Sequence, residues 1–237
     1  MLKITNLSKT YDNSKKAVDN VTLEIPKGEI FAFIGHNGAG KTTTIKCVVG
    51  LLDFEEGEIL IDGLSIKEDP IACKKKIAYI PDNPDIYESL TGIQYLNFIA
   101  DIYQIPKDSR NVEIAKYAKT FEITSNLGDL ISSYSHGMKQ KLCIISALIR
   151  HPKLLILDEP FVGLDPKAAF SVKEIMKQMC DEGSSVFFST HVLEVAEKLC
   201  NRVAIIKNGA IVANGAMEEV KGDKSLEDVF LELEKDA

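Results

Sequence analysis

The sequence predicts an α/β fold with a mostly parallel central sheet, an N-terminal antiparallel β-subdomain and an inserted α-helical subdomain. Two continuous apolar runs, Ile30–Ile34 and Leu154–Leu157, are typical of strands that are buried on both faces. Residues 2–25 instead alternate between apolar and polar side chains, which indicates half-buried antiparallel strands. Residues 83–150 have helical spacing and few strand signals. Strand signals therefore lie on both sides of a helical stretch.

We expect residues 1–81 and 151–237 to form one α/β lobe, into which a helical subdomain of residues 82–150 is inserted. The switch from strand signals to helical spacing comes after the strand expected at Ile77–Ile80, which ends at Pro81. A chain of 237 residues is long enough for one large domain or two small ones.

Gly35–Thr42 match G-x-x-x-x-G-K-[ST], the pattern of a phosphate-binding loop. The loop follows the strand at Ile30–Ile34 and opens a helix that Gly50 closes. Its glycines allow a tight turn, and bare N–H groups at the helix start form an anion site. Lys41 adds a positive charge for the β- and γ-phosphates, and Thr42 adds a hydroxyl for Mg²⁺. We expect nucleotide contacts from Gly35, His36, Asn37, Gly38, Ala39, Gly40, Lys41, Thr42 and Thr43.

Tyr11 lies between the two strands expected in residues 2–25. Its ring could stack on a nucleotide base, because an aromatic face suits any flat π system. It could equally be a surface tyrosine on a turn, and its position alone does not decide between the two. Further along, Glu58–Ile61 is expected to be a strand that ends at a turn. The short run Lys74–Lys76 favours a solvated face over a binding patch.

Helices are expected from Thr91, which can cap the first of them, then over residues 110–121, and then up to Pro152. Their apolar stripes are interpreted as core rather than as sites. A further helix is expected over residues 167–181. Ser225 opens a last helix with the pattern of a capping box.

Two carboxylates follow the apolar run Leu154–Leu157, namely Asp158 and Glu159. The carboxyl end of a buried strand is where α/β sheets place ligand chemistry. Mg²⁺ prefers hard oxygen ligands, which Asp158 and Thr42 can supply. Because side chains alternate along a strand, we expect Glu159 to point elsewhere and to act as a general base on water. The alternative for both carboxylates is an ordinary turn at the end of a strand.

His191 follows the strand expected at Ser185–Ser189. It could bond to a γ-phosphate and orient the attacking water, or it could be an ordinary core or surface histidine. The other histidines, at 36, 136 and 151, have no metal-ligand spacing. Downstream, Asn208-Gly209 between two apolar runs predicts a hairpin with a type I′ turn.

Taken together, these segments resemble the ATP-binding subunits of ABC transporters over essentially the whole chain. Gly35–Thr42 resembles the Walker A motif, and Leu154–Glu159 resembles Walker B with its trailing glutamate. Tyr134–Met138 resembles a variant of the LSGGQ signature, which discriminates this family because many NTPases share the Walker motifs. Other matches are a D-loop at Gly163–Asp165, a switch histidine at His191 and an aromatic A-loop residue at Tyr11.

The resemblance implies a RecA-like P-loop NTPase core that hydrolyses ATP with Mg²⁺. It implies Lys41, Glu159 and His191 as catalytic residues. Thr42 and Asp158 would hold Mg²⁺, together with Asp82, which stands where relatives carry a Q-loop glutamine or glutamate. Asp82 is shorter than either, so we expect it to reach the ion only through a water.

The resemblance also implies two partners, a second nucleotide-binding domain and a separate multi-span membrane permease. Ser135 and Gly137 of one chain would close over the γ-phosphate held by the other chain. The signature carries His136 in place of its first glycine and Met138 in place of its glutamine, and the side chain at 136 adds bulk near a phosphate. Whether the pair is a homodimer or a heterodimer is left open.

The tail Ser225–Leu233 resembles the ending of the subfamily that is paired with ABC-2-type permeases, which are mostly bacterial exporters. The segment Tyr134–Gln140 shares this resemblance. We therefore expect an exporter subunit at the cytoplasmic face of the cell membrane, whose cargo the permease selects.

Composition narrows the possible partners. The net charge of −7 offers no basic footprint for nucleic acid, so we expect no nucleic-acid partner. The odd count of five cysteines without a C-x-x-C pair suits reduced thiols rather than a disulfide framework. We expect neither a signal peptide at residues 1–6 nor a membrane span, since no apolar run approaches about 18 residues.

Two other functions stay open. One is a soluble, non-transport ABC-type ATPase that serves DNA repair or translation, although such proteins usually carry tandem ATPase domains, long coiled-coil inserts or basic patches. The other is a degenerate module that binds ATP without hydrolysing it, a possibility raised by Asp82 and His136.

Overall fold

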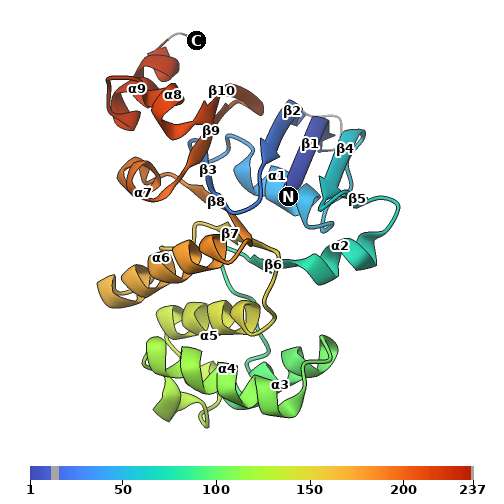
Figure 1. Cartoon of the computed structure of the whole chain (residues 1–237), viewed down its shortest axis with the longest axis vertical. Coiled ribbons are helices and arrows are strands. Elements are labelled where there is room, and N and C mark those ends of the chain that lie inside the picture. Colours follow the sequence, from blue (N-terminus) through green and yellow to red (C-terminus); the bar gives the residue numbers. More distant parts are fainter. Residues whose placement is uncertain (12–15, 236–237) are drawn as a thin grey trace.

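A computed structural model of the chain describes residues 1–11 and 16–235 (Figure 1). The strands of the described residues form two sheets, one four-stranded and one six-stranded. Helices α3, α4 and α5 form a separate group at one end of the molecule, and α8 and α9 lie at the other end (Figure 1). This arrangement is the α/β fold that the sequence predicts.

The four-stranded sheet contains the N-terminal antiparallel strands. Among the described residues its order is β2-β1-β4-β5, and neighbouring strands pair antiparallel. The alternation is confirmed in the described residues of 2–25, since Ile4, Val21 and Leu23 are buried between polar neighbours. The strands are β1 (Leu2–Thr10), β2 (Lys16–Ile25), β4 (Glu56–Ile61) and β5 (Leu64–Ser65).

The six-stranded sheet of the described residues has the order β10-β9-β3-β8-β7-β6. Its strands run parallel except β10, which returns antiparallel to β9 through Asn208 and Gly209. Both turn residues have positive φ, as a type I′ turn requires. The strands are β3 (Ile30–Ile34), β6 (Ile77–Ile80), β7 (Leu154–Asp158), β8 (Ser185–Thr190), β9 (Arg202–Lys207) and β10 (Ala210–Ala216).

Strand β3 is buried on both faces, which explains why its sequence is a continuous apolar run. Ile30, Ala32 and Ile34 enter the hydrophobic cluster on the side of the helical group. Phe31 and Phe33 enter the cluster that faces the antiparallel sheet. Alternate side chains thus enter different cores, so every position must be apolar. The loop that follows β3 is held between these two cores.

The helices expected from the sequence are present, with caps that explain where they begin. Thr91 and Gln94 form a capping box at the start of α3. Asp165 caps α6 by accepting a hydrogen bond from the amide of Ala168 at 2.8 Å. The helices are α1 (Lys41–Val48), α3 (Gly92–Ile102), α4 (Lys107–Thr120), α5 (His136–Leu148), α6 (Pro166–Asp181) and α9 (Leu226–Lys235).

Some elements were not anticipated. Helices α2 (Pro70–Lys76), α7 (Leu193–Leu199) and α8 (Met217–Lys221) are too short to show a clear apolar period. Helix α5 ends at Leu148, close to the end expected near Pro152, and its last turn tightens to i→i−3 hydrogen bonds at Arg150 and His151. Two short 3₁₀ segments, Thr124–Asn126 and Ile131–Ser133, connect α4 to α5.

The described elements between residues 82 and 150 are helical, as the sequence indicates. Their core is not separate from that of the sheet, because Leu96 of α3 and Leu142 of α5 belong to the same cluster as Ile80 of β6. The boundaries of the helical subdomain, at residues 82 and 150, therefore stay a prediction.

Candidate nucleotide site

The loop from Gly35 to Gly40 needs glycine at particular positions. Gly38 and Gly40 have φ values of 82° and 111°, in the region that favours glycine. A Cβ on Gly35 would lie 2.5 Å from the carbonyl oxygen of Ile206, and a Cβ on Gly40 would lie 2.5 Å from that of Ala17. The loop is thus pressed against β9 and β2, which keeps its other side open.

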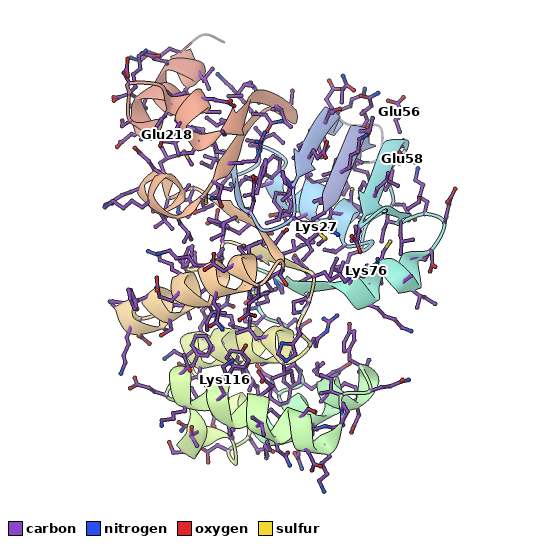
Figure 2. The ribbon with its side chains drawn as sticks, in the orientation of Figure 1. Lys27, Glu56, Glu58, Lys76, Lys116 and Glu218 are labelled. Carbon is purple, nitrogen blue, oxygen red and sulfur yellow. The ribbon has the colours of Figure 1, made fainter. Side chains whose placement is uncertain are left out.

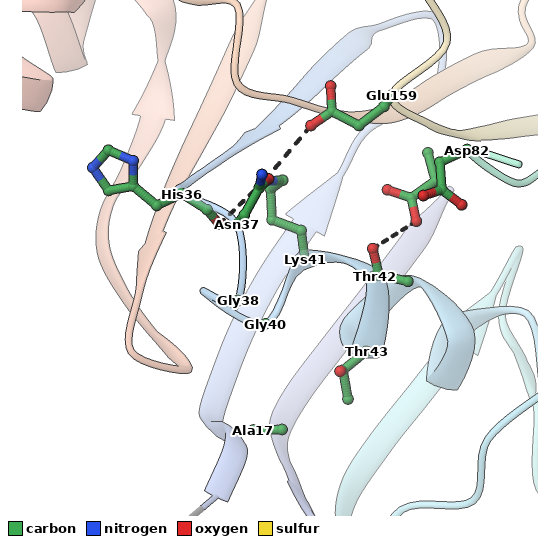
Figure 3. Close-up of a pocket in the computed structure, with 11 residues that line it drawn as sticks. Ala17, His36, Asn37, Gly38, Gly40, Lys41, Thr42, Thr43, Asp82 and Glu159 are labelled. Atoms are coloured by element: carbon green, nitrogen blue, oxygen red, sulfur yellow. Dashed lines mark hydrogen bonds and ion pairs between the residues drawn. The ribbon is translucent and has the colours of Figure 1, made fainter. Parts of the chain in front are cut away.

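Lys41 is the first residue of α1 and is only 6% exposed. Its ammonium group donates hydrogen bonds to the carbonyl oxygens of Gly35 at 2.6 Å and His36 at 3.3 Å. The same Nζ lies 3.7 Å from Oε1 of Glu159 (Figure 3). The backbone carbonyl groups of the loop therefore hold a nearly buried cation at its centre.

Hard oxygen atoms meet beside this lysine. The Thr42 hydroxyl donates to Oδ2 of Asp158 at 2.7 Å, and the Ser189 hydroxyl donates to Oδ1 of the same carboxylate. Asp158 is 1% exposed and is the last residue of β7. Asp82 follows β6 and lines the same cavity. A hydroxyl and carboxylates are the donors that Mg²⁺ prefers, so these residues fit that ion.

Glu159 links β7 to the residues after β8. Its Oε2 lies 3.0 Å from Nδ1 of His191, and its amide donates to the hydroxyl of Ser189 at 3.0 Å. Within residues 1–11 and 16–235, its buried Oε1 has no hydrogen-bond partner. This oxygen faces Lys41 without bonding to it, so it can accept a hydrogen bond from a ligand or a water.

The expectation that strand alternation orients Glu159 is wrong. β7 ends at Asp158, and Glu159 has a φ of 49°, in the left-handed region. A non-glycine residue in this region is strained, and such strain concentrates at functional sites. The turned backbone, rather than the pleat of a strand, separates the two neighbouring carboxylates.

These residues surround a cavity of about 190 Å³ (Figure 3). Its lining residues are Ala17, His36, Asn37, Gly38, Gly40, Lys41, Thr42, Thr43, Asp82, Asp158 and Glu159. Most of them are residues that the sequence predicts. Ala17 was missed, because a lone alanine in an antiparallel strand carries no chemical signal. The hydroxyl of Tyr11 lies 3.4 Å from that of Thr43, which places the predicted aromatic residue beside the start of α1.

His36 was expected to contact the nucleotide, and its side chain takes another direction. Its imidazole is directed away from Lys41 (Figure 3). Nε2 lies 3.3 Å from a carboxylate oxygen of Glu234, and the ring packs edge-on against Phe230 with centroids 5.0 Å apart. His36 contributes its backbone to the cavity, where its carbonyl oxygen accepts a hydrogen bond from Lys41.

The signature segment lies elsewhere. The described residues that line the cavity include neither Ser135 nor Gly137. Ser135 caps α5 by accepting from the amide of Met138 at 3.3 Å. A Cβ on Gly137 would meet the carbonyl oxygen of Gly163 at 2.6 Å, and a Cβ on Gly163 would meet the His136 ring at 2.5 Å. The side chain at 136 thus rests on the D-loop of its own chain.

Lys141, on the next turn of α5, forms an ion pair with Asp165 at 2.6 Å. The segment that starts at Glu159 is therefore attached to the signature helix at two places, Gly163 and Asp165. Ser135 and the loop at Gly35–Gly40 are parts of two separate surfaces of one chain.

The five cysteines are buried with free thiols. Burial raises the pKa of the Cys143 thiol to about 12 and that of the Cys180 thiol to about 11. These thiols stay protonated near neutral pH, so they are poor nucleophiles and poor metal ligands.

Comparisons with known proteins agree with this geometry. The family model described as ABC transporter matches residues 18–162. The chain is 35% identical over 241 residues to the ABC-type transporter ATP-binding protein EcsA of Bacillus subtilis (strain 168), covering 100% of this chain and 97% of that one. It is 34% identical over 220 residues to the linearmycin resistance ATP-binding protein LnrL of the same organism, covering 93% and 70%.

A solved structure described as the ATP-binding subunit of an ABC transporter superposes with a TM-score of 0.95 at 33% identity, covering 99% of both chains. Across residues 1–11 and 16–235, no helix is both long and apolar enough to pass through a bilayer. ATP hydrolysis with Mg²⁺ is the activity of this family. On the motif matches, the fold and these relatives, the chain belongs to the ABC transporter family, as an ATP-binding subunit.

Proposed function

We propose that this chain works as one of a pair of ATPase subunits that energise a separate membrane permease, and that the permease is an exporter. The observation that supports this most strongly is the division of the site. Lys41, Thr42, Asp158 and Glu159 surround one cavity, whereas Ser135 and Gly137 lie outside it. A second chain must supply the missing side.

In this proposal the loop binds the phosphates. Lys41 gives up its carbonyl contacts to the β- and γ-phosphates, and the N–H groups at the start of α1 contribute the positive end of a helix dipole. Thr42 and Asp158 would hold Mg²⁺, and Asp82, which lines the same cavity, would hold one of its waters. The ion, when bound, neutralises charge on the phosphate oxygens.

Glu159 and His191 provide the hydrolytic step. Oε1 of Glu159 faces Lys41 and accepts no hydrogen bond within the described residues, so it can accept a proton from water, while His191 holds Oε2 and fixes the carboxylate. A positioned general base typically contributes 10²–10⁴-fold to the rate. The strained backbone of Glu159 keeps that carboxylate away from the oxygens that would hold the metal ion.

The second chain closes the cavity. Ser135 and Gly137 stand at the start of α5, whose helix dipole favours an anion. When two chains meet head to tail, each α5 would face the phosphates held by the other loop. ATP then joins the chains, and its hydrolysis releases them.

Helix α3 offers a surface for the permease. Tyr87 and Phe98 form an edge-to-face ring pair with centroids 5.6 Å apart, and they are 59% and 42% exposed. Ile102, one turn further along α3, is also exposed. Exposed apolar side chains that gather in this way often mark a protein contact. We propose that the permease covers them.

Purification from membranes tests this function. The wild-type chain should co-purify with a polytopic membrane protein, and Tyr87→Ser with Phe98→Ser should abolish that association without changing nucleotide affinity. Val112→Ser is the matched control, because Val112 is an exposed apolar residue on the neighbouring α4. Stable association with ribosomes or DNA instead would favour the non-transport ATPase.

The proposed direction of transport rests on one relative and on the tail of the chain. The name of LnrL ties that relative to resistance against linearmycin, and removing a toxic compound from a cell is an export function. The tail Ser225–Leu233 resembles that of subunits that serve exporters. Transport measured in vesicles with ATP added on the side of this chain should move cargo away from that side.

A further inference from the structure

Helix α9 contacts the side chain of His36 in the phosphate-binding loop. The Phe230 ring packs edge-on against the His36 imidazole, with centroids 5.0 Å apart and an interplanar angle of 68°. One turn later, Oε2 of Glu234 lies 3.3 Å from Nε2 of His36. One face of α9 therefore presents an aromatic ring and a carboxylate to the same imidazole.

The helix itself is held firmly at both ends. The Ser225 hydroxyl accepts from the amide of Asp228 at 3.1 Å and donates to its carboxylate at 2.7 Å, which caps the start. At the other end, Nζ of Lys207 donates to the carbonyl oxygens of Leu233 at 2.8 Å and Glu234 at 3.0 Å. A cation at the last carbonyls of a helix is favourable. Helix α9 is thus a fixed support.

His36 is also tied to the nucleotide side of the loop. Its carbonyl oxygen accepts from Nζ of Lys41 at 3.3 Å and from the amide of Ala39 at 3.1 Å. A movement of the His36 backbone therefore changes both the position of Lys41 and the turn of the loop. The imidazole points outward to α9, so a contact that restrains the imidazole also restrains the backbone of the same residue.

A cavity lies next to the contact between His36 and α9. This cavity of about 150 Å³ lies beside the loop, lined by His36, Asn37, Gly38, Ala39, Ile206, Lys207, Asn208 and Glu234. On this side, the His36 side chain is held by Phe230 and Glu234 of α9.

We propose that Phe230 and Glu234 are positioning residues for nucleotide binding, because they hold His36 and so keep the loop in the conformation that binds phosphates. Preorganising a binding loop lowers the conformational cost of binding. By linkage, nucleotide must stabilise the docking of α9 by the same factor. The proposal rests on nucleotide binding at this loop and is independent of the permease.

The first test compares two carboxylates of α9. Glu234→Gln keeps the shape of the side chain and removes the charge that faces His36. Glu232→Gln is the matched control, since Glu232 pairs with Lys224 instead. Because His36 is largely exposed, solvent screens the pair and its effect on binding is expected to be small. We expect the Kd for ADP, measured by calorimetry, to rise about threefold in Glu234→Gln and to stay unchanged in Glu232→Gln.

A double-mutant cycle shows whether the effect passes through the imidazole. If it does, Glu234→Gln changes the Kd for ADP in the wild-type background and has no further effect in His36→Ala. Phe230→Leu keeps most of the buried apolar volume. It should likewise raise the Kd for ADP in the wild-type background and have no further effect in His36→Ala. Equal effects of Glu234→Gln in both backgrounds would overturn the proposal.

Hydrogen exchange tests the reciprocal effect without any catalytic readout. ADP should slow amide exchange across Leu226–Lys235 in the wild type and in Glu232→Gln, and should do so less in Glu234→Gln. The proposal is contradicted if the wild-type chain binds ADP and the amides of α9 exchange at the same rate with and without ADP. A wild-type chain that binds no nucleotide contradicts the proposed function instead.

Discussion

Oε2 of Glu159 lies 3.0 Å from Nδ1 of His191, while the other oxygen of the same carboxylate lies 3.7 Å from Nζ of Lys41. One carboxylate thus joins the residue after β7, the residue after β8 and the first residue of α1. The proposed base, the histidine beside it and the cation proposed to bind phosphate are therefore neighbours within a single chain.

Glu159→Gln removes the base and keeps the shape of the site. We expect ATP affinity to be retained and the hydrolysis rate, measured as phosphate release, to fall 10²–10⁴-fold. Glu174→Gln, on the exposed face of α6, is the control and should leave the rate unchanged. Hydrolysis at the wild-type rate in Glu159→Gln would remove Glu159 from this role.

Lys41→Ala removes the cation from the centre of the loop. Nucleotide affinity should fall by at least about tenfold, because a charge-assisted contact to phosphate is lost. Lys46→Ala is the comparison, since Lys46 is an exposed residue in the last turn of the same helix. Titration with ATP checks both variants, and equal affinities for wild type and Lys41→Ala would contradict the phosphate contact.

Asp62→Asn should destabilise the fold in a pH-dependent way. The Asp62 carboxylate accepts from Lys76 at 2.7 Å and Lys153 at 3.1 Å, and Lys27 lies 3.2 Å away. Figure 2 labels two of these lysines, Lys27 and Lys76. These contacts, led by Lys76, hold the pKa of Asp62 well below its usual range. A lowered pKa in the folded state stabilises the fold above the unfolded pKa, near 3.9, and this stabilisation is lost as the pH falls through the folded pKa.

At pH 7 we expect the substitution of Asp62 to lower the free energy of unfolding by about 1 kcal/mol, since solvent screens the two more exposed lysines. Urea denaturation at several pH values measures this difference, which should shrink below about pH 4. Lys27→Gln removes the most exposed partner and should cost less. A constant difference from pH 7 to pH 3 would show that the carboxylate charge is not the cause.

Gly137→Ala tests the packing of the signature segment. The new Cβ would lie 2.6 Å from the carbonyl oxygen of Gly163, so either α5 or the D-loop must move. Because Gly137 lies outside the cavity of its own chain, nucleotide binding by single chains should persist. ATP-dependent pairing, followed by light scattering in the Glu159→Gln background, should weaken. Gly128→Ala is the control, since a Cβ at 128 meets nothing within 4 Å.

Much of this fold could be predicted because its signals are local. The apolar runs at Ile30–Ile34 and Leu154–Leu157 are strands, and Thr91 and Ser225 cap the helices that they precede. The short helix α2 was missed because seven residues show no clear apolar period, although Asp69 caps it and Pro70 opens it.

The site was predictable in its members and less so in their directions. Motif spacing identified Lys41, Thr42 and Asp158 correctly as neighbours, because the pattern encodes one loop and one strand end. The outward direction of the His36 side chain depends on Phe230, far away in the sequence. The orientation of Glu159 depends on a left-handed backbone that no local pattern announces.

The central claim is that one chain holds the triphosphate and another chain completes the site. The most direct measurement is an experimental structure of Glu159→Gln loaded with ATP and Mg²⁺. We predict that Oγ of Ser135 and the amide of Gly137 lie within hydrogen-bond distance of the γ-phosphate held by Lys41 of the other chain. Ser135 and Gly137 turned away from every bound phosphate, in all nucleotide-loaded states, would contradict it.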